Sequence, residues 1–343
     1  MTGEGTSGPL PLTMLPWHEP ARARLEAAVE SNRLPHAVLL HGPAGVGKER
    51  FATALAAALF CTSRGPALVP CGGCADCGLS LAGSHPDLHW LRRLEDKKSI
   101  SVDQVRDVCE QLGMTSMRRG HRIAIVTPAQ AMTVNAQNAL LKTLEEPAAR
   151  TLLVLVTARP SRLLATLRSR CQRIEIARPP PAVAREWLSR ELGSPAAEGL
   201  LEITDGAPLR ALALAPHFEA LQAQMADLLA ALVAGRTEAT GAAAHMMGDG
   251  LPVRLDWLEA WMGRAIRHRT LPNGSHLTFP GGGELQRAAA EVNISAVFRL
   301  VDRVREVRRL LEGSAAPQLL VEALLVELAD SFGRRGVTQW APR

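Results

Sequence analysis

The sequence predicts an α/β fold in which helices cover both faces of a parallel sheet, followed by a region built from helices alone. Three observations support this prediction. An apolar segment at residues 37–40 runs into a glycine-rich loop and then a helix, which is typical of a buried parallel strand. Further apolar segments alternate with helical patterns as far as residue 176. After three prolines at residues 179–181 only helical patterns follow, which indicates a domain boundary.

The first elements of this fold can be assigned in chain order. Residues 1–13 are rich in Gly, Ser, Thr and Pro and are expected to form a disordered leader. Apolar residues at helical spacing predict a helix over residues 20–30. The strand at 37–40 comes next, and a helix over residues 49–60 follows the glycine-rich loop.

The middle of the chain continues the alternation of helices and strands. Helices are predicted over residues 101–112 and 138–147, the second of them ended by its proline. Buried strands are predicted at residues 123–126, 151–157 and 174–176. Strands that alternate with helices in this way indicate a parallel sheet covered on both faces.

The second half reads as helices only. Short helices are expected at residues 182–192 and 196–204, and another from residue 209, as parts of a small helical domain. Long alanine- and leucine-rich helices follow, with mobile loops expected at residues 235–250 and 271–283. Pro317 is expected to open the last helix, whose apolar stripe is Leu320, Leu324, Leu328 and Phe332.

The glycine-rich segment has the spacing of a phosphate-binding loop. Gly42, Gly45, Gly47 and Lys48 fit the pattern G-x-x-x-x-G-K, in which backbone N–H groups surround a polyphosphate and the lysine meets its outer phosphates. An active loop carries Ser or Thr at the next position to bind Mg²⁺, but this chain has Glu49. The loop spacing therefore predicts the fold, while Glu49 argues against ATP hydrolysis.

A second part of the hydrolytic machinery is also missing from the sequence. An ATPase has acidic residues where the strand beside the phosphate loop ends, to hold Mg²⁺ and orient water. Here the strand at 123–126 runs into Thr127, Pro128, Ala129 and Gln130, without a carboxylate. These two departures together favour a nucleotide-binding fold that no longer hydrolyses ATP.

Four of the six cysteines predict a metal site. Cys61, Cys71, Cys74 and Cys77 have the spacing C-x9-C-x2-C-x2-C, which matches a closed structural Zn²⁺ site with no open position for catalysis. The alternative is four unligated thiols. Cys109 lies on the apolar stripe of a predicted helix and is expected to belong to the core.

Several arginines have both a functional and an ordinary interpretation. Arg168 and Arg170, after the third strand, form either a solvated basic turn or a fork for a transferring phosphoryl group. Arg210 starts a helix after a glycine turn, where it either faces solvent or reaches back toward a nucleotide. A basic helix face carrying Arg303, Arg305, Arg308 and Arg309 is either solvated or in contact with DNA.

Composition limits the class of protein without naming it. The 343 residues are 47% hydrophobic but only 3% aromatic, so Ala, Leu and Val must build the cores of two or three domains. The net charge of +5 is a mild bias compatible with a nucleic-acid neighbourhood. The sequence has neither a long uninterrupted apolar run nor a signal pattern, so a cytoplasmic protein is expected, and its cysteines are expected to be reduced.

Taken together, these motifs resemble the clamp-loader subunits of bacterial DNA polymerase III within the AAA+ family, and among them the member that does not hydrolyse ATP. The resemblance extends over nearly the whole chain and is weakest in the C-terminal helices. It rests on residues 34–48, the four-cysteine insertion, residues 138–147 and the Ser169-Arg170-Cys171 motif. Leu15-Pro16-Trp17 also looks like the start of such a subunit.

The resemblance implies an organisation and a role. It implies an AAA+ module at residues 14–178 with a zinc module at 61–77, a helical lid at 179–215 and a helical collar at 216–343. Arg170, with Ser169 and Cys171, would complete the ATP site of a neighbouring subunit as an arginine finger.

The same resemblance implies the partners. These are the gamma/tau ATPase and delta subunits in a hetero-oligomer, the sliding clamp, and primed DNA reached through the complex. The polymerase activity would belong to the assembly, and no ATPase activity is expected from this chain alone. Two other functions stay open from the residues: an active AAA+ ATPase with unusual Mg²⁺ ligands, and a zinc-dependent nucleic-acid-binding protein.

Overall fold

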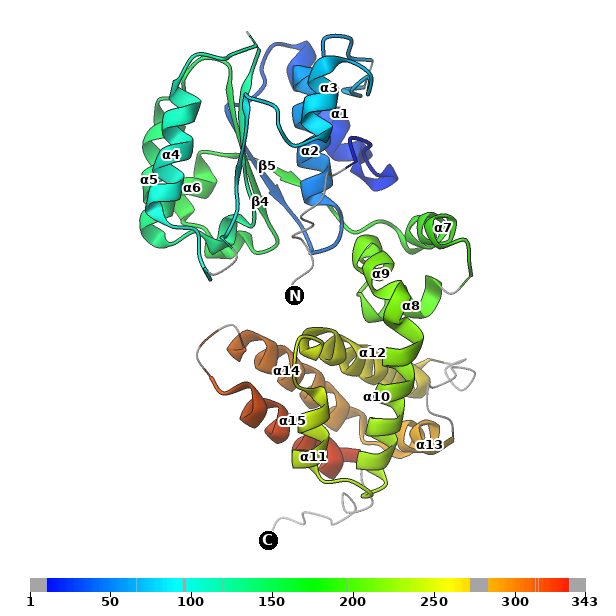
Figure 1. Cartoon of the computed structure of the whole chain (residues 1–343). Helices are drawn as coiled ribbons and strands as arrows, with labels where there is room; N and C mark the ends of the chain where they lie inside the picture. Colours follow the sequence, from blue (N-terminus) through cyan, green and yellow to red (C-terminus); the bar gives the residue numbers. More distant parts are fainter. Residues whose placement is uncertain are drawn as a thin grey trace. The chain divides into compact units, whose positions relative to one another are not determined.

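The computed structural model describes residues 11–65, 67–94, 97–118, 120–195, 197–271, 283–311, 313 and 315–332. Contacts divide these residues into two compact units, each considered separately (Figure 1). The sheet unit contains the described residues as far as Trp187 together with Ala207–Arg210, and the helical unit contains Leu188–Gly206 and the described residues from Ala211 onward. None of the helices formed by these residues is both long and apolar enough to cross a membrane.

The sheet unit is built on five parallel strands in the order β2-β3-β4-β1-β5. Their bounds are β1 Ala37–His41, β2 Leu88–Leu91, β3 Arg122–Val126, β4 Thr151–Thr157 and β5 Gln172–Glu175. Strands β3 and β4 are buried along their whole length, as expected of parallel strands covered on both faces. The order places β1, and therefore the glycine-rich loop that follows it, between β4 and β5.

Helices cover both faces of this sheet (Figure 1). One face carries α4 (Val102–Gly113), α5 (Val134–Glu145) and α6 (Ala165–Ser169), and the other carries α1 (Glu19–Glu30), α2 (Lys48–Phe60) and α3 (Ala75–Leu81). Helix α4 begins at the predicted capping box of Ser101 and Gln104. The predicted α/β sheet followed by helices alone is confirmed.

The helical unit packs around one large apolar core. Helix α7 (Pro181–Leu192) ends in this unit, and α9 (Pro208–Leu214) begins in the sheet unit. The remaining helices are α8 (Ala197–Ile203), α10 (Phe218–Val233), α11 (Ala239–Met246), α12 (Leu251–Thr270), α13 (Gly283–Glu291), α14 (Ile294–Leu310) and α15 (Pro317–Phe332). The core includes Trp257 and Trp261 of α12, and the predicted stripe of α15 contributes Leu324, Leu328 and Phe332.

One expected loop is wrong and two segments cannot be compared. Residues 235–250 were expected to form a mobile loop, but they contain α11, whose Ala242, Ala243 and Met246 are buried against the core of the helical unit. The prediction was wrong because the flanking glycines are typical of a loop and the apolar stripe between them is short. The expected loop at 271–283 and the expected leader at 1–13 lie largely outside the described residues.

Candidate functional site: a closed phosphate loop and an exposed arginine

The glycine-rich segment adopts the backbone of a phosphate-binding loop. Gly42, Gly45 and Gly47 have φ values of +146°, +78° and +86°, a region that favours glycine. Lys48, the first residue of α2, is fully buried, and its Nζ donates to the carbonyl oxygen of Pro43 at 2.6 Å. The lysine thus binds the loop itself at the place where a phosphate oxygen would be expected.

Glu49 occupies the position of the usual Mg²⁺ ligand and is held by protein groups. It is buried, and its Oε1 accepts a hydrogen bond of 2.6 Å from the hydroxyl of Thr127 at the end of β3. Its Oε2 lies 3.6 Å from Nη2 of Arg92, just after β2. The two departures noted in the sequence, Glu49 and Thr127, therefore contact each other. A carboxylate in a protein hydrogen bond stands where an ATPase would hold its metal.

The chain before α1 packs against the glycine-rich loop. Trp17 Nε1 donates to the carbonyl oxygen of Val46 at 2.8 Å, and Nε2 of His18 lies 3.0 Å from the same oxygen. The backbone N–H of Leu15 donates to Nδ1 of His18, so the ring is neutral with its proton on Nε2. Burial lowers the pKa of His18 to about 4. A side chain at Gly47 would come within 2.6 Å of Leu15.

Arg210 contacts the loop as well. The N–H of Leu209 donates to the carbonyl oxygen of Gly45 at 3.1 Å, and a Cβ added at Gly45 would come within 2.4 Å of Cγ of Arg210. The sequence placed Arg210 either in solvent or near a nucleotide, and the structure brings it to the loop. At the end of β4, Thr157 donates to Gln130 at 2.6 Å. Polar groups around the loop are therefore bonded within the chain.

Arg170 follows helix α6 and stays partly exposed. Its Nη1 donates to the carbonyl oxygen of Thr166 at 3.0 Å, and its Nη2 lies 2.7 Å from Oε1 of Glu145. The arginine side chain is 37% exposed. Neighbouring Ser169 donates its hydroxyl to Thr166 at 3.0 Å, while Cys171 is buried in the core. Burial raises the pKa of Cys171 to about 12, so this thiol serves packing.

The four predicted metal ligands come together. The sulfur atoms of Cys61, Cys71, Cys74 and Cys77 all lie within 4.8 Å of one another. Two of the pairs are 3.9 and 4.0 Å apart. A tetrahedron of thiolates around Zn²⁺ has edges of about 3.8 Å, because each Zn–S bond is about 2.3 Å long. The donor set therefore fits a structural zinc, and four bound thiolates would leave no position for water.

The start of helix α3 favours one thiolate of this cluster. The backbone N–H of Cys77 donates to Sγ of Cys74 at 3.5 Å and lowers the pKa of Cys74 to about 6. Burial raises the pKa of Cys77 to about 12 in the absence of metal. Asp76 forms an ion pair with Arg118, which ties the cysteine cluster to the segment before β3. Sequence reasoning missed this anchor because Asp76 and Arg118 are far apart in the chain.

The basic face on α14 is largely paired. Arg308 lies 2.8 Å from Asp256 and 2.9 Å from Glu259, both on α12, and Arg305 lies 2.9 Å from Glu259. Arg303 pairs with Glu306 and Glu327 at 2.7 and 3.2 Å. Of the two interpretations made from the sequence, these contacts favour a helix face engaged in ion pairs over one that reads DNA.

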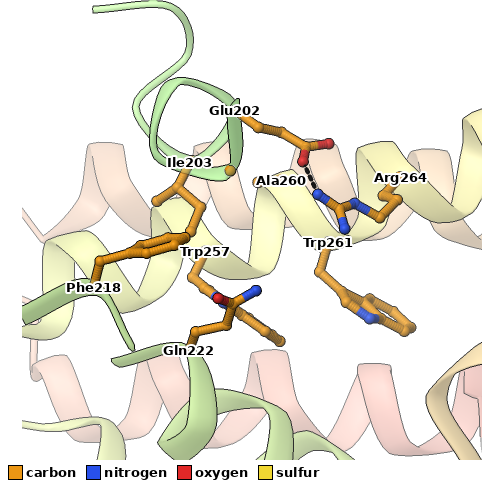
Figure 2. A pocket seen from close by; sticks show the side chains of 9 residues that line it. Glu202, Ile203, Phe218, Gln222, Trp257, Ala260, Trp261 and Arg264 are labelled. Atoms are coloured by element: carbon orange, nitrogen blue, oxygen red, sulfur yellow. Dashed lines mark hydrogen bonds and ion pairs between the residues drawn. The ribbon is translucent and has the colours of Figure 1, made fainter. Parts of the chain in front are cut away.

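A hollow in the helical unit lies beside Phe218, Trp257 and Trp261 (Figure 2). Glu202 and Arg264 form an ion pair at this hollow, and Arg267 also pairs with Glu202. The cavity volume is about 20 Å³, enough for about one water molecule. Pockets for cofactors are more than ten times larger, so this hollow is not a small-molecule site.

The sheet order and the altered loop define a class: AAA+ proteins that keep the nucleotide-binding fold while replacing the usual magnesium ligands. The family model described as DNA polymerase III, delta subunit, matches residues 17–180. DNA polymerase III subunit delta-prime from Pseudomonas aeruginosa is 35% identical over 327 residues, covering 93% of this chain and 98% of that protein. The protein of the same name from Escherichia coli is 34% identical over 316 residues, covering 90% and 94%. The chain belongs to the DNA polymerase III subunit delta-prime family.

A solved structure is also similar to this chain. It is a DNA polymerase III gamma subunit-related protein from Thermotoga maritima, with 17% identity and a TM-score of 0.49, covering 91% of this chain and 99% of that one. The family resemblance drawn from the motifs is confirmed by the curated relatives.

Proposed function

We propose that this chain is the non-hydrolysing subunit of a clamp loader and supplies Arg170 to the ATP site of a neighbouring subunit. The observation that carries the proposal is a contrast within one unit. The chain's own phosphate loop is engaged by its own side chains, while Arg170 is exposed with N–H donors available to a partner. An arginine placed in trans stabilises the charge that develops on a transferring phosphoryl group.

Two features support the absence of turnover by this chain. Glu49 and Thr127 bond to each other where a hydroxyl and a carboxylate would otherwise bind Mg²⁺. Lys48 donates to Pro43, and the segment from Leu15 to His18 packs on the loop. A nucleotide would have to displace several hydrogen bonds that the protein already makes.

Membership of the delta-prime family suggests the setting in which Arg170 acts. The chain would assemble with the gamma/tau ATPase and delta subunits, help to open the sliding clamp and reach primed DNA through the complex. Ser169 and Cys171 would support the finger, since one bonds to helix α6 and the other anchors the segment in the core. The four cysteines would hold a structural Zn²⁺.

Replacement of Arg170 tests this proposal directly. In the assembled loader with primed DNA, Arg170→Ala should remove hydrolysis at the adjacent ATP site, because an arginine finger contributes about 10³ to 10⁵ in rate. Total ATP turnover should fall by at least the share of that site, measured by phosphate release. The matched control is Arg173→Ala, an exposed arginine three residues further on. Unchanged hydrolysis by a fully assembled R170A loader would exclude the finger role.

A further inference from the structure

The guanidinium of Arg170 donates hydrogen bonds to two helices of its own subunit. One acceptor is the Thr166 carbonyl oxygen in α6, at 3.0 Å from Nη1, and the other is Oε1 of Glu145 at the end of α5, at 2.7 Å from Nη2. Arginine has five N–H donors in one plane, so two are used here and three are left. The side chain is thus fixed on one edge and open on the other.

We propose that Glu145 is a positioning residue for Arg170, which holds the arginine in the orientation that a neighbour's triphosphate requires. This inference rests on the finger role proposed above. A free arginine side chain loses considerable rotamer freedom when it engages a ligand, and ordering it beforehand removes that cost from the reaction. Glu145 does this ordering within the folded subunit, before any partner is present.

The exposure of Arg170 explains why a partner is needed for this purpose. The side chain is 37% exposed. A long side chain on a surface samples many orientations unless a partner fixes it. The carboxylate of Glu145 comes from a different helix, and its charge-assisted hydrogen bond selects one of those orientations.

The adjacent acidic residue provides a matched control. Glu145 and Glu146 both stand at the end of α5 and both are exposed, but the carboxylate on Arg170 is that of Glu145. Glu145→Ala removes the acceptor, Glu145→Gln keeps an amide oxygen that still accepts from Nη2, and Glu146→Ala removes the neighbouring charge. Because the pair is on the surface, these variants are expected to fold and assemble, which size-exclusion chromatography checks.

The experiment measures DNA-stimulated ATP hydrolysis by the assembled loader. E145A should lower kcat by roughly twofold to tenfold, the cost of ordering one long side chain, with KM for ATP unchanged because the finger acts on the transition state. E145Q should stay within about twofold of the wild type, since its amide can replace the hydrogen bond, and E146A should match the wild type. In an R170A background, E145A should have no further effect.

The outcomes separate the two proposals. If R170A suppresses hydrolysis while E145A behaves like E146A, the finger stands and the positioning role of Glu145 is overturned. Equal losses in E145A and E145Q, or a gain of activity in E145A, would also overturn it. If R170A itself leaves hydrolysis unchanged, the finger role is excluded, and the positioning role of Glu145 that rests on it is excluded as well.

Discussion

At the scale of single residues, two residues that depart from the hydrolytic pattern form a hydrogen bond with each other. Glu49 and Thr127 are 78 residues apart in sequence, yet their side chains meet at 2.6 Å. Each was singled out in the sequence as a departure from the hydrolytic pattern. Their contact could not be predicted, because β4 separates β3 from β1 in the sheet and sequence spacing does not specify that the end of β3 reaches the first turn of α2. Two other contacts also join residues from separate elements and could not be predicted from the sequence. Arg92 lies 3.6 Å from Glu49, and Glu145 forms an ion pair with Arg170.

The buried ring of His18 predicts a pH dependence of stability. Burial lowers the pKa of His18 from 6.5 to about 4 in the folded protein, so the unfolded chain binds more protons between these values. The stability contributed by the neutral ring is complete above about pH 6.5 and is lost as the pH falls toward about 4. Between about pH 7.5 and pH 5 the loss attributable to His18 should be about 2 kcal/mol in the free energy of unfolding.

Urea unfolding of two variants isolates this term from the other histidines. His18→Gln should reduce the overall stability but flatten its slope between about pH 5 and pH 7.5, because the group that takes up the proton on unfolding has been removed. His245→Gln, which replaces an exposed histidine on α11, should leave the slope as it is. A slope in H18Q as steep as in the wild type would show that His18 is not held neutral.

At the scale of elements, sequence periodicity found most strands and helices but missed β2 and α3. The buried strands β3 and β4 and the capped helix α4 were predicted within a residue or two, because an apolar run or a capping box marks each of them. Strand β2, with the sequence LHWL, has only four residues, too few for a periodic pattern, and it pairs with β3. Helix α3 has only seven residues and begins at Cys74 of the cysteine cluster.

The cysteine cluster makes a prediction at the same scale. The purified chain should contain about one zinc ion, because four sulfur atoms within 4.8 Å of one another match a closed tetrahedral site. Cys77→Ser should lower the zinc content to near zero and reduce the melting temperature, since binding of a structural metal contributes to folding free energy. Metal analysis together with thermal unfolding would measure both effects.

Cys109 is the matched control for the zinc site. It lies partly buried against the core beside α5, outside the cluster, so Cys109→Ser should keep the full zinc content. The zinc prediction is wrong if the wild-type protein contains no zinc and all four cluster thiols react with a thiol reagent.

At the scale of the whole molecule, the two units differ in the features that specify their folds. The sheet unit is specified by strands, caps and a glycine-rich loop, which carry local signals that a sequence reveals. The helical unit depends on one apolar core and on ion pairs such as Arg308 with Asp256, which join α14 to α12. From the sequence, the basic face of α14 was either solvated or in contact with DNA, and its ion pairs with Asp256 and Glu259 could not be predicted because these residues lie on α12.

The response of the intact chain to MgATP discriminates a non-hydrolysing subunit from an ATPase. A ligand at about 100 times its dissociation constant stabilises the folded state by about 2.7 kcal/mol, which raises the melting temperature of a unit of this size by about 5 °C or more. Because Lys48, Glu49 and Thr127 are bonded within the chain, we expect millimolar MgATP to shift the melting temperature of the isolated protein by less than about 1 °C. The same preparation should release no phosphate. A clear shift, with turnover that Lys48→Ala abolishes, would instead identify an ATPase that uses other magnesium ligands, and the role of Arg170 would then have to be judged beside a working site in its own subunit.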